Sequence, residues 1–139
     1  MSPVDVELPA EASSAAAARA AVRSLLVGPG LQGVPRPDQQ ALDRVLLLTS
    51  EVVTNAILHA RTALRLTASV EGGQVRVRVY DSMRLVPRVR SYGTDAGTGR
   101  GMHLVSALAD QWGVEETSSG KCVWFTVAVV AGEQSARLG

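Results

Sequence analysis

The segment Leu48 to Ala60 carries polar side chains at a spacing that could hold a metal-bound phosphate. If the segment is helical, Glu51, Asn55 and His59 follow one another every four residues and share one face. A carboxylate, an amide and an imidazole then lie beside an apolar stripe that can be buried against a sheet. The simpler interpretation is an amphipathic helix with a solvated polar edge. The stripe consists of Val45, Leu46, Val52, Val53, Ala56 and Ile57.

The glycine-rich stretch Gly97-Thr98-Gly99-Arg100-Gly101 is a second candidate, for phosphate binding. Glycines let the backbone approach a ligand closely, and a helix that starts here would direct its free N–H groups at an anion. A glycine-rich turn without a ligand is the alternative. The stretch is not a Walker-type loop, because no Lys-Ser or Lys-Thr pair follows it, and it is not a dinucleotide fingerprint, because no strand leads directly into it.

Asp81 is a third candidate, because it follows the strand pattern Val75 to Tyr80 directly. A carboxylate held by a sheet at the edge of a cleft could accept a hydrogen bond from the exocyclic amino group of adenine. The alternative is a turn aspartate that caps its own loop, which is the commoner use of this residue.

The N-terminal half of the chain predicts the elements that position the first candidate. Val4 to Leu8 alternates apolar and acidic residues, which is typical of a short edge strand. The alanine-rich stretch Glu11 to Val27 predicts a helix, with Ser13 and Ser14 as possible caps. A second, longer helix is expected from Asp38 to about Ala60.

The C-terminal half predicts two antiparallel hairpins separated by a helix. One face of the first hairpin's second strand is valine and the other is polar, so we expect one face of the sheet to be buried and the other to face water. The strands are expected over Ala63 to Val70, Val75 to Tyr80, Gly113 to Thr117 and Cys122 to Val130, and the helix over Gly101 to Asp110.

Together these elements predict an α+β fold: a two-layer sandwich whose mostly antiparallel sheet has three helices on one face. The stretch Asp81 to Arg100 is longer than an ordinary connection, which is typical of a functional lid or a disordered segment. Residues 1–139 are expected to form a single domain, with a frayed tail over about 132–139.

Composition excludes several classes of protein. A net charge of +1 gives no reason to expect direct binding to nucleic acid, although Arg84, Arg88, Arg90 and Arg100 could form a local basic region. Cys122 is the only cysteine and lies in an apolar run, so we expect a buried thiol without a disulfide. No signal-peptide pattern occurs and the longest apolar run is too short to cross a bilayer, so a cytoplasmic protein without membrane contact is expected.

Taken in order, the three candidates resemble the asparagine box and the two glycine boxes of the GHKL (Bergerat) ATP-binding fold. The stretches Thr49 to Ala60, Val79 to Pro87, Gly99 to Trp112 and Gly120 to Phe125 resemble a subgroup of that family, the small stand-alone anti-sigma-factor serine kinases of bacteria. The matches and their spacing cover about Val4 to Val130.

The resemblance implies a role for each matching residue. Asn55 would bind Mg²⁺ bridging the phosphates of ATP, and Glu51 would be the general base. Asp81 would accept a hydrogen bond from the adenine amino group. The Gly99-Arg100-Gly101 stretch would wrap the phosphates, and Gly97 would help a lid to move. His59 matches a position that is often histidine in the subgroup, where packing or a helix-end role is expected.

The chain departs from the family pattern at two positions. Met83 stands where the family usually has glycine, two residues after Asp81. Lys121, the only lysine of the chain, follows Gly120 where many members have threonine. The hydroxyl that helps to read adenine is then missing, or is replaced by Lys121 extending toward the ligand.

The resemblance implies a protein-serine kinase that binds a sigma factor and phosphorylates an anti-sigma-factor antagonist protein, often as a homodimer. A non-catalytic partner-binding module is the main alternative, and Glu51 argues against it because such a module needs no base. A metabolic ATPase is disfavoured because no substrate domain is evident. A histidine-kinase fragment is disfavoured because no phosphoacceptor helix precedes the domain in this sequence.

Overall fold

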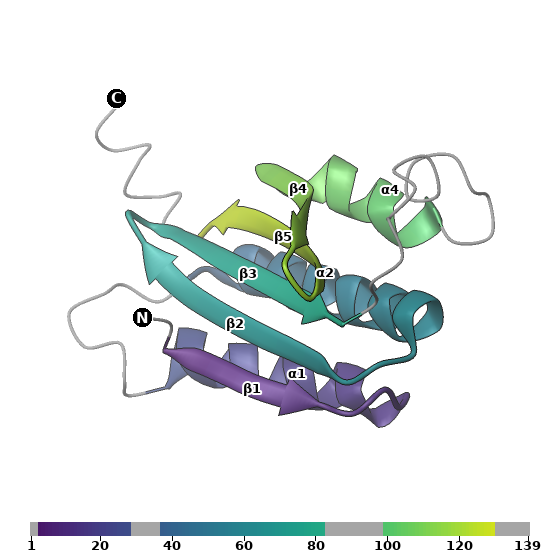
Figure 1. The fold of residues 1–139 in the computed structure, drawn as a ribbon. Helices are drawn as coiled ribbons and strands as arrows, with labels where there is room; N and C mark the ends of the chain where they lie inside the picture. The colour runs from purple at the N-terminus through teal and green to yellow at the C-terminus, as the bar shows by residue number, and fades with distance from the viewer. Residues whose placement is uncertain (1–2, 29–36, 83–98, 130–139) are drawn as a thin grey trace.

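The computed structural model describes residues 3–28, 37–82 and 99–129, with the backbone alone for residues 99–102. Its elements follow the order that the sequence predicts (Figure 1). They are β1 (Val4–Leu8), α1 (Ser13–Val27), α2 (Gln39–Ala60), β2 (Leu64–Glu71), β3 (Gln74–Asp81), α4 (Gly99–Leu108), β4 (Gln111–Thr117) and β5 (Gly120–Ala128).

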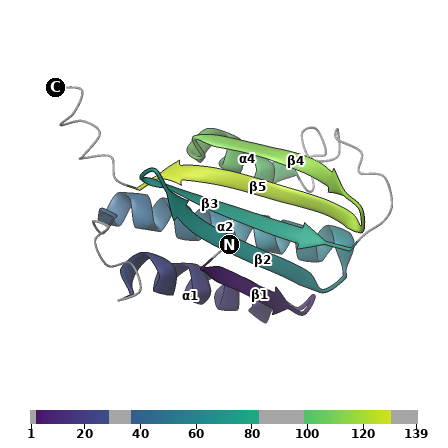
Figure 2. The same ribbon diagram turned by 60° about the vertical axis from the view of Figure 1, so that its left-hand side comes forward.

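The strands form one five-stranded sheet in the order β1-β2-β3-β5-β4, and each of these neighbouring pairs is antiparallel. Figures 1 and 2 show the sheet on one side and α1, α2 and α4 together on the other. The predicted two-layer α+β sandwich is therefore confirmed. The predicted hairpin of β2 and β3 is confirmed too, with Gly72 and Gly73 at φ values of 59° and 78° in its turn.

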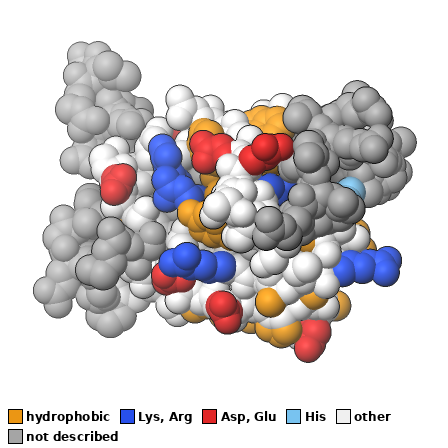
Figure 3. All heavy atoms as spheres, viewed as in Figure 1, with side chains coloured by type: hydrophobic (Ala, Val, Ile, Leu, Met, Phe, Trp, Pro, Cys, Tyr) orange, Lys and Arg blue, Asp and Glu red, His pale blue; other side chains and the backbone are white. Residues whose placement is uncertain are grey.

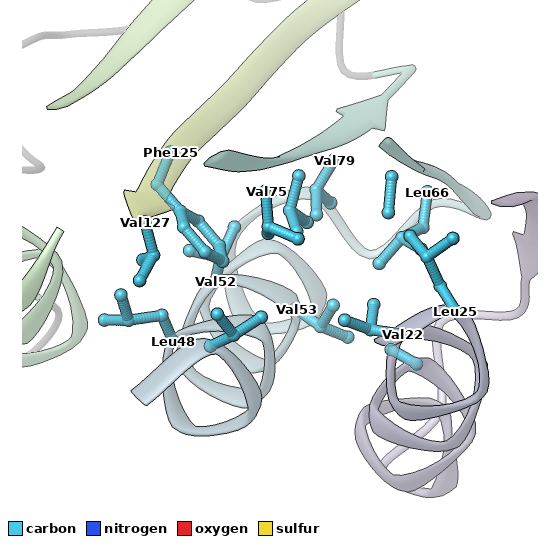
Figure 4. Packing of buried hydrophobic residues seen from close by; sticks show 14 of the residues in the cluster. Val22, Leu25, Leu48, Val52, Val53, Leu66, Val75, Val79, Phe125 and Val127 are labelled. Carbon is cyan, nitrogen blue, oxygen red and sulfur yellow. The ribbon is translucent and has the colours of Figure 1, made fainter. Parts of the chain in front are cut away.

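The core lies between the inner face of the sheet and the helices (Figure 4). In β3, buried and half-buried residues alternate strictly, so that Val75, Val77 and Val79 point inward. Phe125 of β5 is fully buried and lies among side chains that α2 contributes. Burying one such side chain contributes about 1.5–3 kcal/mol, so this layer is the main source of stability. The α2 side chains labelled there are Leu48, Val52 and Val53.

The outer face of the sheet is polar, as the alternation predicts. Figure 3 shows mixed charges and scattered hydrophobic side chains on this side of the molecule. Arg76 lies over the ring of Trp124 at 5.2 Å, a cation–π contact between β3 and β5. Gly113 of β4 leaves room for that indole, because a Cβ there would lie 2.9 Å from the ring of Trp124.

Several element ends differ from the predictions by one or two residues. Helix α1 begins after Ala12, which makes no side-chain cap, and the Ser14 hydroxyl instead donates to the Pro9 carbonyl at 2.6 Å. The serines are therefore not caps. Strand β5 begins at Gly120 rather than Cys122. Of the predicted lid, Asp81 to Arg100, residues 83–98 lie outside the described residues, and so does the predicted tail, 132–139.

Helix α2 begins as predicted, with Asp38 as its N-cap. The carboxylate accepts a hydrogen bond from the backbone N–H of Ala41 at 2.7 Å. At the other end, Arg61 turns the chain toward β2 in the left-handed conformation, with φ of 56°. Residues at its two ends therefore set where α2 begins and ends, and α2 is the helix that carries Glu51, Asn55 and His59.

Replacing Asp38 by alanine should lower the free energy of unfolding by about 1 kcal/mol, because an orphan N–H of α2 loses its acceptor. Urea denaturation followed by circular dichroism measures the change. Asp38→Ser should keep most of the stability, and Asp43→Ala, an exposed acid on the same helix, should change it by less than about 0.5 kcal/mol. Equal losses for Asp38→Ala and Asp43→Ala would contradict the capping role.

Candidate functional site

Helix α2 carries Glu51, Asn55 and His59 on one face, as the four-residue spacing predicts. The side chain of Asn55 is buried, with the residue only 7% exposed, while Glu51 and His59 are half-buried. Among the described residues, the Nδ2 group of Asn55 has no hydrogen-bond partner. A buried amide donor without a partner costs about 1–3 kcal/mol, so its presence needs a reason beyond packing.

Helix α4 packs against α2 and forms the other side of this region. Its first residues, Gly99, Arg100 and Gly101, form the first turn of the helix. In Figures 1 and 2, the start of α4 lies at the end of the sheet where α2 and β3 end. The first turn therefore offers backbone N–H groups at that end. Gly97 and the side chain of Arg100 lie outside the described residues.

Asp81 is the last residue of β3, and it lies directly opposite Lys121 of β5. Their side chains form an ion pair, with 2.6 Å between Nζ of Lys121 and Oδ2 of Asp81. Both side chains are almost fully buried, at 4% and 2% exposure. Because water is largely excluded, the Coulombic attraction between the two groups is stronger than in an exposed pair, and it offsets part of the cost of burying both charges.

The backbone near the ion pair is closely packed. A Cβ at Gly120 would collide with the carbonyl of Asp81, so only glycine allows β5 to start this close to the end of β3. The N–H of Ser82 donates to the hydroxyl of Thr62 at 3.2 Å, which ties the end of β3 to the connection after α2. The pair and the C-terminal end of α2 thus lie at the same end of the sheet.

The ion pair is the site feature that the sequence analysis did not predict. From the sequence, Asp81 is expected to accept a hydrogen bond from the adenine amino group, and the hydroxyl that helps to read adenine is expected to be missing or replaced by Lys121 extending toward the ligand. The structure shows the ammonium group of Lys121 on the carboxylate, and the role of Asp81 toward adenine stays a prediction. The pairing follows from the register of β3 and β5, in which Val79 lies opposite Val123 and two further residues along β3 bring Asp81 opposite Lys121.

Cys122 takes no part in this region. It points to the outer side of the sheet, opposite Tyr80, and is buried. Burial raises the pKa of its thiol to about 11, so the reactive thiolate is scarce at neutral pH. The expectation that Cys122 is buried is confirmed.

The described residues contain no cluster of three or more His, Cys, Asp or Glu side chains that could bind a metal by themselves. None of their helices combines the length and the apolar character needed to cross a membrane.

The family model of the histidine kinase-like ATPase domain matches residues 8–127, which is most of the chain. The chain therefore belongs to this family, and the GHKL-type fold that the sequence motifs indicate is confirmed. No curated protein is significantly similar to the chain.

Solved structures of a bacterial kinase share this fold. The blue-light activated histidine kinase of Erythrobacter litoralis EL346 is 29% identical, with a TM-score of 0.54, over 68% of this chain and 32% of that one. A structure of the histidine kinase domain of the same protein is 25% identical, with a TM-score of 0.56, over 91% of this chain and 64% of that one. The chain thus spans about a third of the first structure and just under two thirds of the second.

Replacing Asn55 by leucine should leave the free energy of unfolding unchanged or raise it, because a buried Nδ2 group with no partner in the described ranges gives way to an apolar group of similar size. Chemical denaturation without nucleotide measures the effect. Val52→Ala, at a fully buried position on the same helix, should lower the free energy of unfolding by about 2 kcal/mol. This variant is the positive control for lost packing on α2. A comparable loss of unfolding free energy in Asn55→Leu would mean that the amide stabilises the folded chain, which would contradict the prediction.

The Cys122 thiol should react slowly with Ellman's reagent at pH 8, because a pKa of about 11 instead of 9.0 leaves about a hundredfold less thiolate. Full reactivity should return in urea. Since folding raises this pKa, the contribution of Cys122 to stability is intact below pH 9 and is lost as the pH rises toward 11. Cys122→Ala should remove that part of the pH dependence; rapid labelling of the folded protein would contradict the burial.

Proposed function

We propose that this chain binds ATP with Mg²⁺ between α2 and α4 and transfers the γ-phosphoryl group to a serine of a partner protein. The observation that carries the proposal is the buried Nδ2 group of Asn55, which has no partner within the part of the chain that the structure describes and lies one helical turn from the half-buried carboxylate of Glu51. Membership of the histidine kinase-like ATPase domain family supports ATP as the ligand.

The residues of α2 suit a metal-bound triphosphate. The amide oxygen of Asn55 is a hard ligand of the kind that Mg²⁺ prefers, and its Nδ2 group can donate to a phosphate oxygen. Mg²⁺ binds few protein groups and takes its other ligands from phosphates and water. The bound ion supplies charge neutralisation at the phosphates.

The other candidate residues complete the nucleotide site in this proposal. Backbone N–H groups of the Gly99-Arg100-Gly101 turn contact the phosphates, with Gly97 in the preceding segment. Asp81 lies at the end of the sheet where the base is bound, and it accepts a hydrogen bond from the adenine amino group.

Glu51 acts as the general base in the transfer. Its carboxylate takes the proton of the attacking serine hydroxyl as the bond from the serine oxygen to the γ-phosphorus forms. The bond between that phosphorus and the bridging oxygen breaks, and ADP leaves. A half-buried carboxylate suits this role, because it is accessible to a substrate and partly shielded from water.

The partner in this proposal is an anti-sigma-factor antagonist, and the chain itself is an anti-sigma factor that binds a sigma factor, as a homodimer. The resemblance of the α2 and α4 motifs to the stand-alone anti-sigma-factor kinases supports this assignment. The likeness to a histidine kinase leaves the acceptor residue open, so the assay must identify the phosphorylated side chain.

A non-catalytic partner-binding module is the second candidate. The Asp81–Lys121 ion pair favours it, because the carboxylate expected to meet adenine already has a cation as partner. In that case, the chain would bind a protein partner without transferring phosphate.

Replacing Glu51 by glutamine should preserve ATP binding and slow transfer by about 10²–10⁴-fold, the usual contribution of a general base. Titration calorimetry with Mg²⁺ and a non-hydrolysable ATP analogue measures binding, and mass spectrometry of the antagonist measures phosphoserine. Asn55→Ala should abolish the magnesium dependence of binding.

Matched controls on α2 are Asp43→Ala for the acid and Thr54→Ala for the polar side chain, both exposed and expected to behave as wild type. Transfer at the wild-type rate by Glu51→Gln would refute the base assignment. Tight partner binding by wild type, without nucleotide binding or transfer, would select the non-catalytic module.

A further inference from the structure

Helix α2 exposes two leucines that take no part in the core. Leu47 is 43% exposed and Leu58 is 61% exposed, and the described ranges hold no other exposed large hydrophobic side chain. Neither leucine belongs to the buried core cluster or packs against it. Single exposed leucines are ordinary on a protein surface, so their exposure alone indicates no function. Their position on the helix is more informative.

Both leucines lie along the same line of α2 as Glu51. Because a helix turns by about 100° per residue, Leu47 lies about 40° and Leu58 about 20° around the helix axis from Glu51. In Figure 2, α2 lies between α1 and α4, and it contacts both of these helices. The line of Leu47, Glu51 and Leu58 therefore follows the exposed side of the middle helix, with the acid between the two apolar side chains.

This line lies where a phosphoryl acceptor has to bind. In the proposed transfer, Glu51 takes the proton of a serine that belongs to another protein. That serine reaches Glu51 from outside, so the residues on either side of it cross the surface of α2 in both directions. Apolar side chains among them would be buried against Leu47 and Leu58, and water would leave the surroundings of the carboxylate.

The spacing along α2 determines which side chains of an extended acceptor meet the leucines. Along the axis, Leu47 is about 6 Å from Glu51, and Leu58 is about 10 Å from it in the other direction. An extended chain advances about 3.3 Å per residue, and alternate side chains share a face. With its serine at Glu51, such a chain presents the residue two positions away to Leu47. The residue four positions away on the other side comes within reach of the flexible Leu58 side chain.

We propose that Leu47 and Leu58 are the docking residues of the phosphoryl acceptor: they bind an extended serine-containing segment with apolar side chains on the same face as the serine. The inference rests on the proposed function, in which Glu51 is the base. It adds the class of segment that is recognised. The two leucines position the serine hydroxyl at Glu51 and take no part in the transfer itself.

Two synthetic peptides of equal composition test the proposal with the full chain, ATP and Mg²⁺. Each has one central serine in a polar background. The first carries leucines two and four residues from the serine on both sides, which covers both chain directions. The second carries them one and three residues away, on the opposite face of an extended chain. The value of kcat/KM for phosphoserine formation should be at least about tenfold higher for the first peptide.

Variants of the two leucines show whether α2 reads this pattern. Replacing both Leu47 and Leu58 by glutamine should raise KM for the first peptide about tenfold or more and leave kcat nearly unchanged, because binding alone is lost. The difference between the two peptides should then disappear. Replacing both by methionine keeps apolar side chains and should preserve the difference. Ala17→Gln, at an exposed position of α1, is the matched control and should behave as wild type.

The outcomes separate the two proposals. Wild type that binds no ATP analogue in calorimetry overturns the proposed function, and the inference with it. Wild type that binds the analogue but phosphorylates neither peptide, or both equally, overturns the inference alone. A glutamine double variant that is folded by circular dichroism and still prefers the first peptide does the same. So does a wild-type dimer that this variant breaks in sedimentation analysis, because the leucines would then bind a second copy of the chain.

Discussion

The packing of α2 against the inner face of the sheet determines where every candidate site residue lies. This helix contacts α1, α4, β3 and β5, so it is the common neighbour of both layers. Its apolar face is fully buried at Val45, Leu48, Val52 and Val53. Because packing fixes the orientation of this apolar face, it also fixes the orientation of the polar side chains on α2. These include Glu51 and Asn55.

The site combines two different electrostatic environments within one layer. Along α2, a buried amide and a half-buried carboxylate provide oxygen and N–H groups without a fixed positive charge. At the end of β3 and β5, a buried acid and a buried base neutralise each other. The first environment suits a metal-bound polyphosphate, while the second suits a neutral ring with hydrogen-bonding edges. The fold brings both to the same end of the sheet.

The fold could be predicted from sequence because its signals are local and repeated. The alternation of apolar and polar residues in Val75 to Tyr80 follows the two-residue period of a strand, and the apolar stripe on α2 follows the period of a helix. Asp38 marks the start of α2 because its side chain accepts a hydrogen bond from the backbone of that helix. The start of α1 differs from the prediction, because the Ser14 hydroxyl donates to the Pro9 carbonyl rather than capping the helix.

The ion pair could not be predicted in the same way, since Asp81 and Lys121 are distant in sequence and meet only through the register of β3 and β5. The motif alone identified Asp81 as a candidate acceptor, but the chemistry of a carboxylate depends on what lies across the sheet. The lack of a partner for Nδ2 of Asn55 among the residues that the structure describes likewise results from packing, which helical periodicity does not reveal.

The opposed charges also bear on how the strands find each other during folding. Side chains alternate between the faces of a sheet, so a slip of one residue between β3 and β5 would turn Lys121 outward to water. Asp81 would then remain on the inner face and lose the ammonium group of Lys121. Such a mispaired intermediate carries a large electrostatic penalty, so the two central strands have one strongly favoured alignment even though their valine-rich sequences could otherwise slide.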